Sequence, residues 1–102
     1  YLMYSGAGAD TMYYNLGYAT SSSPDGTFTK SETNPISQPQ SPPDVGIYGP
    51  GHHAIWEDGE GKAWVIYHQQ RDNGTGWGRF LCMDELEVNG DGELEVTFTR
   101  DE

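Results

Sequence analysis

Two adjacent histidines in the stretch GPGHHAIWED, residues 49–58, are the residues whose type and spacing most directly suggest chemistry. His52 and His53 follow a Gly-Pro-Gly turn and precede an apolar, aromatic run typical of a β-strand. Successive side chains of a strand point to opposite faces of the sheet, so at most one of the two can face a given pocket. From residue type alone, each histidine is more often a hydrogen-bonded structural residue than a ligand.

The sixteen acidic residues are the other source of possible chemistry, because a general acid and a general base are often a pair of carboxyl groups. Such a pair must share a cleft and have different pKa values. The acids that come closest together lie instead in predicted hairpin turns or late on a predicted strand, where solvated surface positions are expected. These acids are Glu57, Asp58, Glu60, Asp84, Glu85, Glu87, Asp91 and Glu93.

The elements that must position these residues are short β-strands, because no window of helix length carries apolar residues at three- and four-residue spacing. The connectors SPDG, EDGEGK and NGDG contain residues that tolerate positive φ, as tight hairpins require. Consecutive strands are therefore predicted to be antiparallel neighbours. The predicted strands are residues 1–5, 12–20, 27–31, 52–57, 63–70, 79–88 and 93–99.

A proline-rich stretch divides the chain, since residues 32–50 contain five of its six prolines. A weak repeat spans this stretch: YLMYS at residues 1–5 matches WVIYH at residues 64–68. Four-stranded meanders joined by long crossovers are typical of β-propeller blades. We therefore predict an all-β partial propeller of about two blades. Residues 1–31 form an incomplete blade that lacks its first strand, residues 32–50 a crossover, and residues 51–102 a final four-stranded blade.

Composition excludes some classes of partner. The formal net charge is −11 and the pI is near 4.3, which argues against nucleic acid, because phosphate binding needs clustered Lys and Arg. A solvated surface explains the acidity, with a salt-adapted source or divalent-cation binding as alternatives. No apolar run is long enough to predict a membrane span. Cys82 is the single cysteine and is predicted to be buried.

The segments YLMYSG, GYATSSSPDGTFTKSETNPI, GPGHHAIWEDGEGKAWVIYH and GRFLCMDELEVNGDGELEV together resemble the last two blades of family 43 glycoside hydrolases. Those proteins are five-bladed propellers that act on arabinan, xylan and related polysaccharides. The resemblance implies hydrolysis with inversion, in which an Asp base, a Glu acid and a second Asp act together. All three family positions lie upstream of Tyr1. The chain is thus expected to contain none of the catalytic residues.

The resemblance also assigns the remaining candidates. It places His52 on the innermost strand of the last blade, facing the sugar pocket or a central Ca²⁺ that it contacts through water, since calcium prefers oxygen ligands. It places His53 between blades. It matches Arg79 to an arginine of the sugar pocket, whose planar guanidinium suits hydrogen bonds to sugar hydroxyls or to a carboxylate. The alternative role for Arg79 is an ion pair between strands. Trp77 lies on a glycine-rich loop and could stack on a sugar ring.

The expected function is therefore part of a glycosidase that binds arabinose- or xylose-containing glycans. The expected partners are the remaining propeller blades or a second copy of the chain, through the unpaired edge at residues 1–5. The alternatives are a non-catalytic carbohydrate-binding module, with Tyr and Trp side chains as its platform, and a purely structural β-domain.

Overall fold

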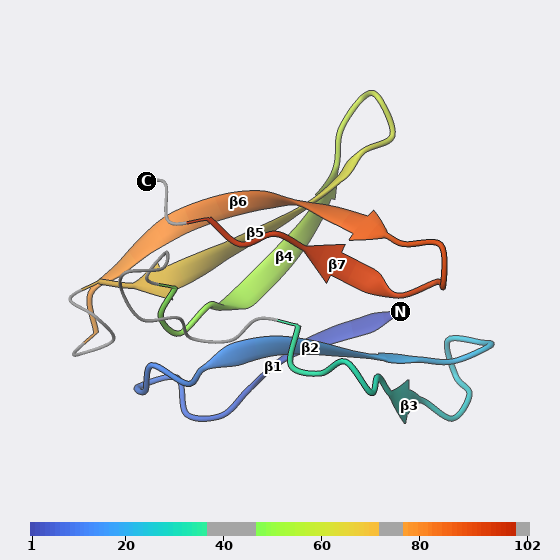
Figure 1. Ribbon diagram of the computed structural model, residues 1–102, viewed down its shortest axis with the longest axis horizontal. Helices are drawn as coiled ribbons and strands as arrows, with labels where there is room; N and C mark the ends of the chain where they lie inside the picture. Colours follow the sequence, from blue (N-terminus) through green and yellow to red (C-terminus); the bar gives the residue numbers. More distant parts are fainter. Residues whose placement is uncertain (37–46, 72–76, 100–102) are drawn as a thin grey trace.

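The computed structural model describes residues 1–36, 47–71 and 77–99, and these residues form seven β-strands (Figure 1). In this described part no helix is long and apolar enough to cross a membrane. The strands are β1 (Leu2–Gly6), β2 (Asn15–Thr20), β3 (Thr29–Lys30), β4 (Gly51–Glu57), β5 (Ala63–Gln70), β6 (Arg79–Val88) and β7 (Leu94–Val96).

The strands form two antiparallel sheets, in the orders β1-β2-β3 and β4-β5-β6-β7. Within each sheet every strand pairs with its neighbour in sequence, and Figure 1 shows one sheet lying against the other. The prediction of an all-β, partial β-propeller with antiparallel meanders is confirmed. The predicted division at residues 31 and 50 stays a prediction, and part of the predicted crossover lies outside the described residues.

Three strands, β2, β3 and β7, are shorter than predicted, with β3 covering only residues 29–30 of the predicted 27–31. In β2 and β7 other hydrogen bonds replace the ladder. Residues 12–14 were expected to belong to β2, but they lie in turns, where Tyr14 N–H donates to the Thr11 carbonyl at 3.3 Å. The last strand was expected to reach Thr99 and ends at Val96. The Thr99 N–H donates to a side chain, Asp84, at 3.2 Å.

The core lies between the two sheets, where regular alternation along β5 and β6 buries every second residue. Val65 and Tyr67 of β5 and Phe80 and Cys82 of β6 pack against Leu16 of β2. The prediction that Cys82 is buried is confirmed, with 3% of its surface exposed. Burying apolar surface contributes about 25 cal/mol per Å², so this contact holds the two sheets together.

The opposite face of the four-stranded sheet carries exposed apolar side chains in the described part of the chain. Its exposed apolar residues include Trp56 on β4 and Leu81 and Met83 on β6, which are 50%, 74% and 51% exposed. Among the described residues β1 pairs with β2 alone, so its other edge is also open. Soluble monomers rarely leave a contiguous apolar face of this kind without a covering partner.

A buried carboxylate fixes the end of the described chain to the core. Asp84 is 7% exposed and accepts hydrogen bonds from the Tyr67 hydroxyl at 2.6 Å and from the Thr99 hydroxyl at 2.9 Å. Burial raises the pKa of Tyr67 far above its usual range, and the bond to Asp84 raises it further, so the phenol remains a donor. Gln69 in turn donates to the Tyr67 oxygen at 3.0 Å.

Replacing this carboxylate tests its contribution to stability. We expect Asp84→Asn to lower the free energy of unfolding by about 1–3 kcal/mol, because an amide NH₂ group would face the buried donors. Urea unfolding measures the change. Glu87→Gln, at an exposed position of the same strand, is the matched control and should have almost no effect. An equal effect of both substitutions would contradict the assigned role.

Candidate functional site

His52 lies at a bulge where the regular pairing of β4 with β5 is interrupted. Gly51 pairs with His68, and the next pair is Ala54 with Ile66, so β4 has one extra residue here. His52 has φ of 53°, in the left-handed region that costs a non-glycine residue about 1–2 kcal/mol. Its N–H donates to the Ser5 hydroxyl of β1 at 2.9 Å. A strained residue fixed by a neighbouring sheet is typical of functional sites.

The His52 ring belongs to a cluster of rings at this end of the molecule. It meets the His68 ring edge-on, with 5.9 Å between ring centroids. The Tyr14 ring stacks on His68 at 6.0 Å and packs directly against Gly51, so that any Cβ at position 51 would collide with it. Sequence reasoning missed Tyr14. The only local signal was the glycine before the histidine pair, whose partner is 37 residues away in sequence.

His53 lies on the other side of β4 from the His52–His68 contact. It lines a largely apolar cavity of about 430 Å³ between the sheets, together with Met3 of β1 and Ile55 of β4. The two histidines therefore have different surroundings, as expected. The cause is not regular alternation alone, because the bulge changes the phase of the strand between Gly51 and Ala54.

Burial lowers the pKa of His53, and the neighbouring His52 lowers it further. Burial also lowers the pKa of His68, with added contributions from the positive charge of Arg79 and from His52. Both imidazoles therefore favour the neutral form near pH 7.

Arg79 begins β6 at the same end of the sheet. Its guanidinium donates to the Ala9 carbonyl at 2.6 Å and to the Gly78 carbonyl at 3.1 Å, and it lies 5.2 Å from the centre of the Trp77 ring. The Ala9 bond ties the β1–β2 loop to the second sheet, a structural role that the sequence did not suggest. Trp77 is 70% exposed, so its ring can reach a ligand.

Gln70 and Gly49 hold the same loop. The Gln70 amide donates to the Thr11 carbonyl, and Gly49 N–H donates to the Met12 carbonyl at 2.9 Å. Gly49 has φ of 57°, and a Cβ at this position would collide with Gln70. These contacts place Tyr14 beside the histidines.

The hairpin acids that the sequence analysis considered do not join this cluster. Glu57, Asp58 and Glu60 belong to the β4–β5 hairpin, and Asp91 and Glu93 to the β6–β7 hairpin, at the opposite end of the strands. Asp58 closes its hairpin by accepting the Glu60 and Lys62 N–H groups at 2.8 and 3.0 Å. The hydrogen bond from the Trp64 indole is the main cause that lowers the pKa of Asp58.

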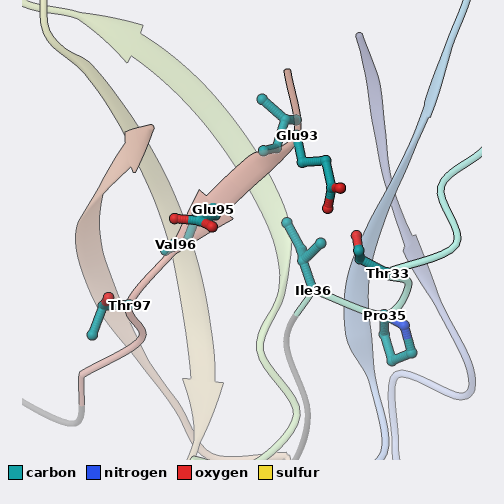
Figure 2. A pocket seen from close by; sticks show the side chains of 8 residues that line it. Thr33, Pro35, Ile36, Glu93, Glu95, Val96 and Thr97 are labelled. Carbon is teal, nitrogen blue, oxygen red and sulfur yellow. The ribbon is translucent and has the colours of Figure 1, made fainter. Parts of the chain in front are cut away.

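Two open pockets near β7 also contain carboxylates. Figure 2 shows one of about 320 Å³, in which the Glu93 side chain points toward Thr33 and Ile36 whereas Glu95 points to the other side of β7. The Glu95 carboxylate accepts a hydrogen bond from Asn89 at 2.8 Å. Both acids line this pocket, but their side chains point to different sides of β7, so they are not placed as a general acid and base.

The described residues contain no group of three or more His, Cys, Asp or Glu side chains placed to hold a metal ion. The prediction that His52 contacts calcium is not tested by this geometry.

The fold and its ring-lined end define a portion of a β-propeller, and the sequence identifies its family. Residues 1–94 match the family described as glycosyl hydrolases family 43, so the chain belongs to this family. This confirms the family resemblance and is consistent with the expected C-terminal portion of such a protein. A search of the curated proteins gives no match.

Three solved structures show the same fold. A thermostable family-43 glycoside hydrolase is 33% identical with a TM-score of 0.85, over 98% of this chain and 32% of that one. An endo-1,4-β-xylanase from Bacteroides thetaiotaomicron is 26% identical with a TM-score of 0.79, over 95% and 33%. A GH43 protein from Bacillus licheniformis is 26% identical with a TM-score of 0.76, over 92% and 19%. The chain thus spans a third or less of the length of these relatives.

The contact between Tyr14 and Gly51 is testable by adding a single methyl group. We expect Gly51→Ala to lower the free energy of unfolding by about 1–3 kcal/mol, because the ring must move away from His68. Gly59→Ala is the matched control, since nothing lies within 4 Å of a Cβ there. Thermal unfolding gives the stability. A Gly51→Ala protein as stable as the control would show that Tyr14 is not packed there.

The lowered pKa values of His53 and His68 predict a dependence of stability on pH. In the unfolded chain both imidazoles bind a proton near pH 6.5, whereas in the folded chain they do so only at lower pH. Stability should therefore fall as pH drops through 6.5 toward the folded-state pKa values. The urea midpoint between pH 7.5 and 5.5 measures this. The double variant His53→Gln/His68→Gln should show a smaller decrease, and an equal decrease would contradict the assignment.

Proposed function

We propose that this chain is the C-terminal part of a glycoside hydrolase that cleaves arabinose- or xylose-containing glycans with inversion. The family match over residues 1–94 is the observation that carries the proposal. The endo-1,4-β-xylanase structure, 26% identical over 95% of the chain, supports a xylose-containing substrate.

In this proposal the end of the sheet where β4 and β6 begin contributes one wall of the sugar pocket. His52 presents an exposed imidazole, Trp77 an exposed ring, and Arg79 a guanidinium close to both Trp77 and the β1–β2 loop. Aromatic faces stack on the apolar faces of sugar rings, and N–H donors bind their hydroxyl groups. These three residues bind and orient the sugar.

The catalytic acid and base come from outside the chain in this proposal. An inverting hydrolase needs two carboxyl groups roughly 6.5–9.5 Å apart with room for a water between them. The hairpin acids lie at the other end of the strands from His52, and Asp84 is engaged with Tyr67 and Thr99. None of these described acids is placed to act on a sugar held beside His52.

Calcium at this position would need ligands from elsewhere. The described neighbours of His52 are the Ser5 hydroxyl, His68 and, through His68, Tyr14. Calcium takes six to eight oxygen ligands, for the most part carboxylates, carbonyls and water. The described residues alone therefore do not fit a calcium site, and we assign them no step that involves the ion.

The uncovered surfaces support the remaining propeller blades as the partner. The face with Trp56, Leu81 and Met83 and the open edge of β1 are both surfaces that a further blade or strand could cover. A second copy of the chain could also occupy the β1 edge, although its net charge of −11 opposes self-association at low salt.

The chain alone and the longer protein encoded with it give a direct test. We expect the purified chain not to hydrolyse aryl xylosides or arabinosides, because its described residues place no acid–base pair beside His52, and the longer protein to hydrolyse at least one of them. Turnover that follows the chain through purification would contradict its non-catalytic role. Sugar binding without hydrolysis by the longer protein would favour a binding module.

Trp77 allows a sharper test in the longer protein. Because its side chain is 70% exposed, Trp77→Ala should leave folding intact and raise KM about five- to tenfold through the lost stacking contact. Trp77→Phe keeps an aromatic face and is the matched control, with KM close to the original value. An unchanged KM in the alanine variant would remove Trp77 from the site.

A further inference from the structure

The direction of the His52 side chain depends on a conformation that its own strand does not favour. His52 is one of two described non-glycine residues with positive φ, the other being Ala7. It is also adjacent to the break in the β4–β5 ladder between Gly51 and Ala54. A histidine gains nothing locally from this conformation, so a contact from elsewhere must compensate.

Ser5 supplies that contact from the other sheet. It lies near the end of β1, where it pairs with Leu16 of β2. Its hydroxyl accepts the His52 N–H at 2.9 Å across 47 residues of sequence. An N–H at a bulge has no partner in the ladder, so a side-chain acceptor from a neighbouring sheet determines whether the bulge is favourable.

The bulge determines how the imidazole meets the His68 ring. In an uninterrupted ladder from the β4–β5 hairpin, the pairs Trp56–Trp64 and Ala54–Ile66 would continue to His52 paired with His68. Gly51 takes that place instead, and His52 turns so that its ring meets His68 edge-on at 5.9 Å.

We propose that Ser5 is a positioning residue for His52: its hydroxyl holds the left-handed bulge and with it the edge-on arrangement of the imidazole against His68. This inference rests on the proposed function in one respect, the placement of His52 in the sugar pocket. It adds that a residue of the first sheet controls the geometry of that pocket through a single hydrogen bond.

Nuclear magnetic resonance on the full 102-residue chain tests the geometry directly. A residue with positive φ gives a strong nuclear Overhauser effect between its own amide and Hα protons. This His52 signal should be strong in the original chain, weakened in Ser5→Ala and restored in Ser5→Thr, which keeps the hydroxyl. Ser22→Ala, at an exposed serine of the same half of the chain, is the matched control and should retain the signal.

A double-mutant cycle separates this role from a general effect on folding. We expect Ser5→Ala to reduce the folding equilibrium constant about fivefold, in line with one lost hydrogen bond. In a His52→Gly background the reduction should be at least as large, because the N–H of residue 52 still donates to Ser5 and glycine keeps the positive φ without strain. Because His52→Gly removes the strain, the double variant also allows the folding equilibrium constant to be measured if Ser5→Ala alone unfolds the chain.

Two results would overturn the proposal. One is a Ser5→Ala chain that keeps the strong amide–Hα signal of His52, and the other is a reduction of the folding equilibrium constant by less than twofold in both backgrounds. Failure of the proposed function gives a different result, since a longer protein without glycosidase activity would leave the resonance signals and the cycle unchanged.

Discussion

The packing of Leu16 against the inner face of the four-stranded sheet is the contact on which the rest of the structure depends. Leu16 is the fully buried residue that the first sheet adds to the core cluster. It packs there against four side chains of the second sheet, Val65, Tyr67, Phe80 and Cys82. Because β2 is fixed there, the loop before it must run across the end of β5 and β6. The geometry of the candidate site thus depends on how the two sheets pack against each other.

Polar contacts then fix the orientation of the β1–β2 loop, which apolar packing alone does not determine. Gln70, Gly49 and Arg79 each bind a backbone carbonyl of the β1–β2 loop, at Thr11, Met12 and Ala9 respectively. Hydrogen bonds contribute only about 1 kcal/mol each, but they depend on direction and so fix how the loop lies. Tyr14 of the β1–β2 loop and His52 of β4 consequently contact the same His68 ring.

The two ends of the four-stranded sheet serve different purposes. At the hairpin end, acids such as Asp58 close turns by accepting backbone N–H groups. At the other end, imidazoles, a phenol and a guanidinium gather and carboxylates are absent from the described contacts. This division explains how a chain with sixteen acidic residues can belong to a hydrolase family and yet place no described acid–base pair beside its sugar-binding candidates.

Local sequence determined the strands, the hairpins and the burial of Cys82, because alternation and turn residues act over a few positions. The bounds of β5 and β6 agree with those predicted from the sequence. Tertiary structure decided the bulge at His52, the place of Tyr14 and the bond from Arg79 to Ala9, since each joins residues at least 37 apart in sequence. No periodic pattern encodes such a contact. It exists only once the two sheets are packed and the strain at one residue is offset by a hydroxyl from the other sheet.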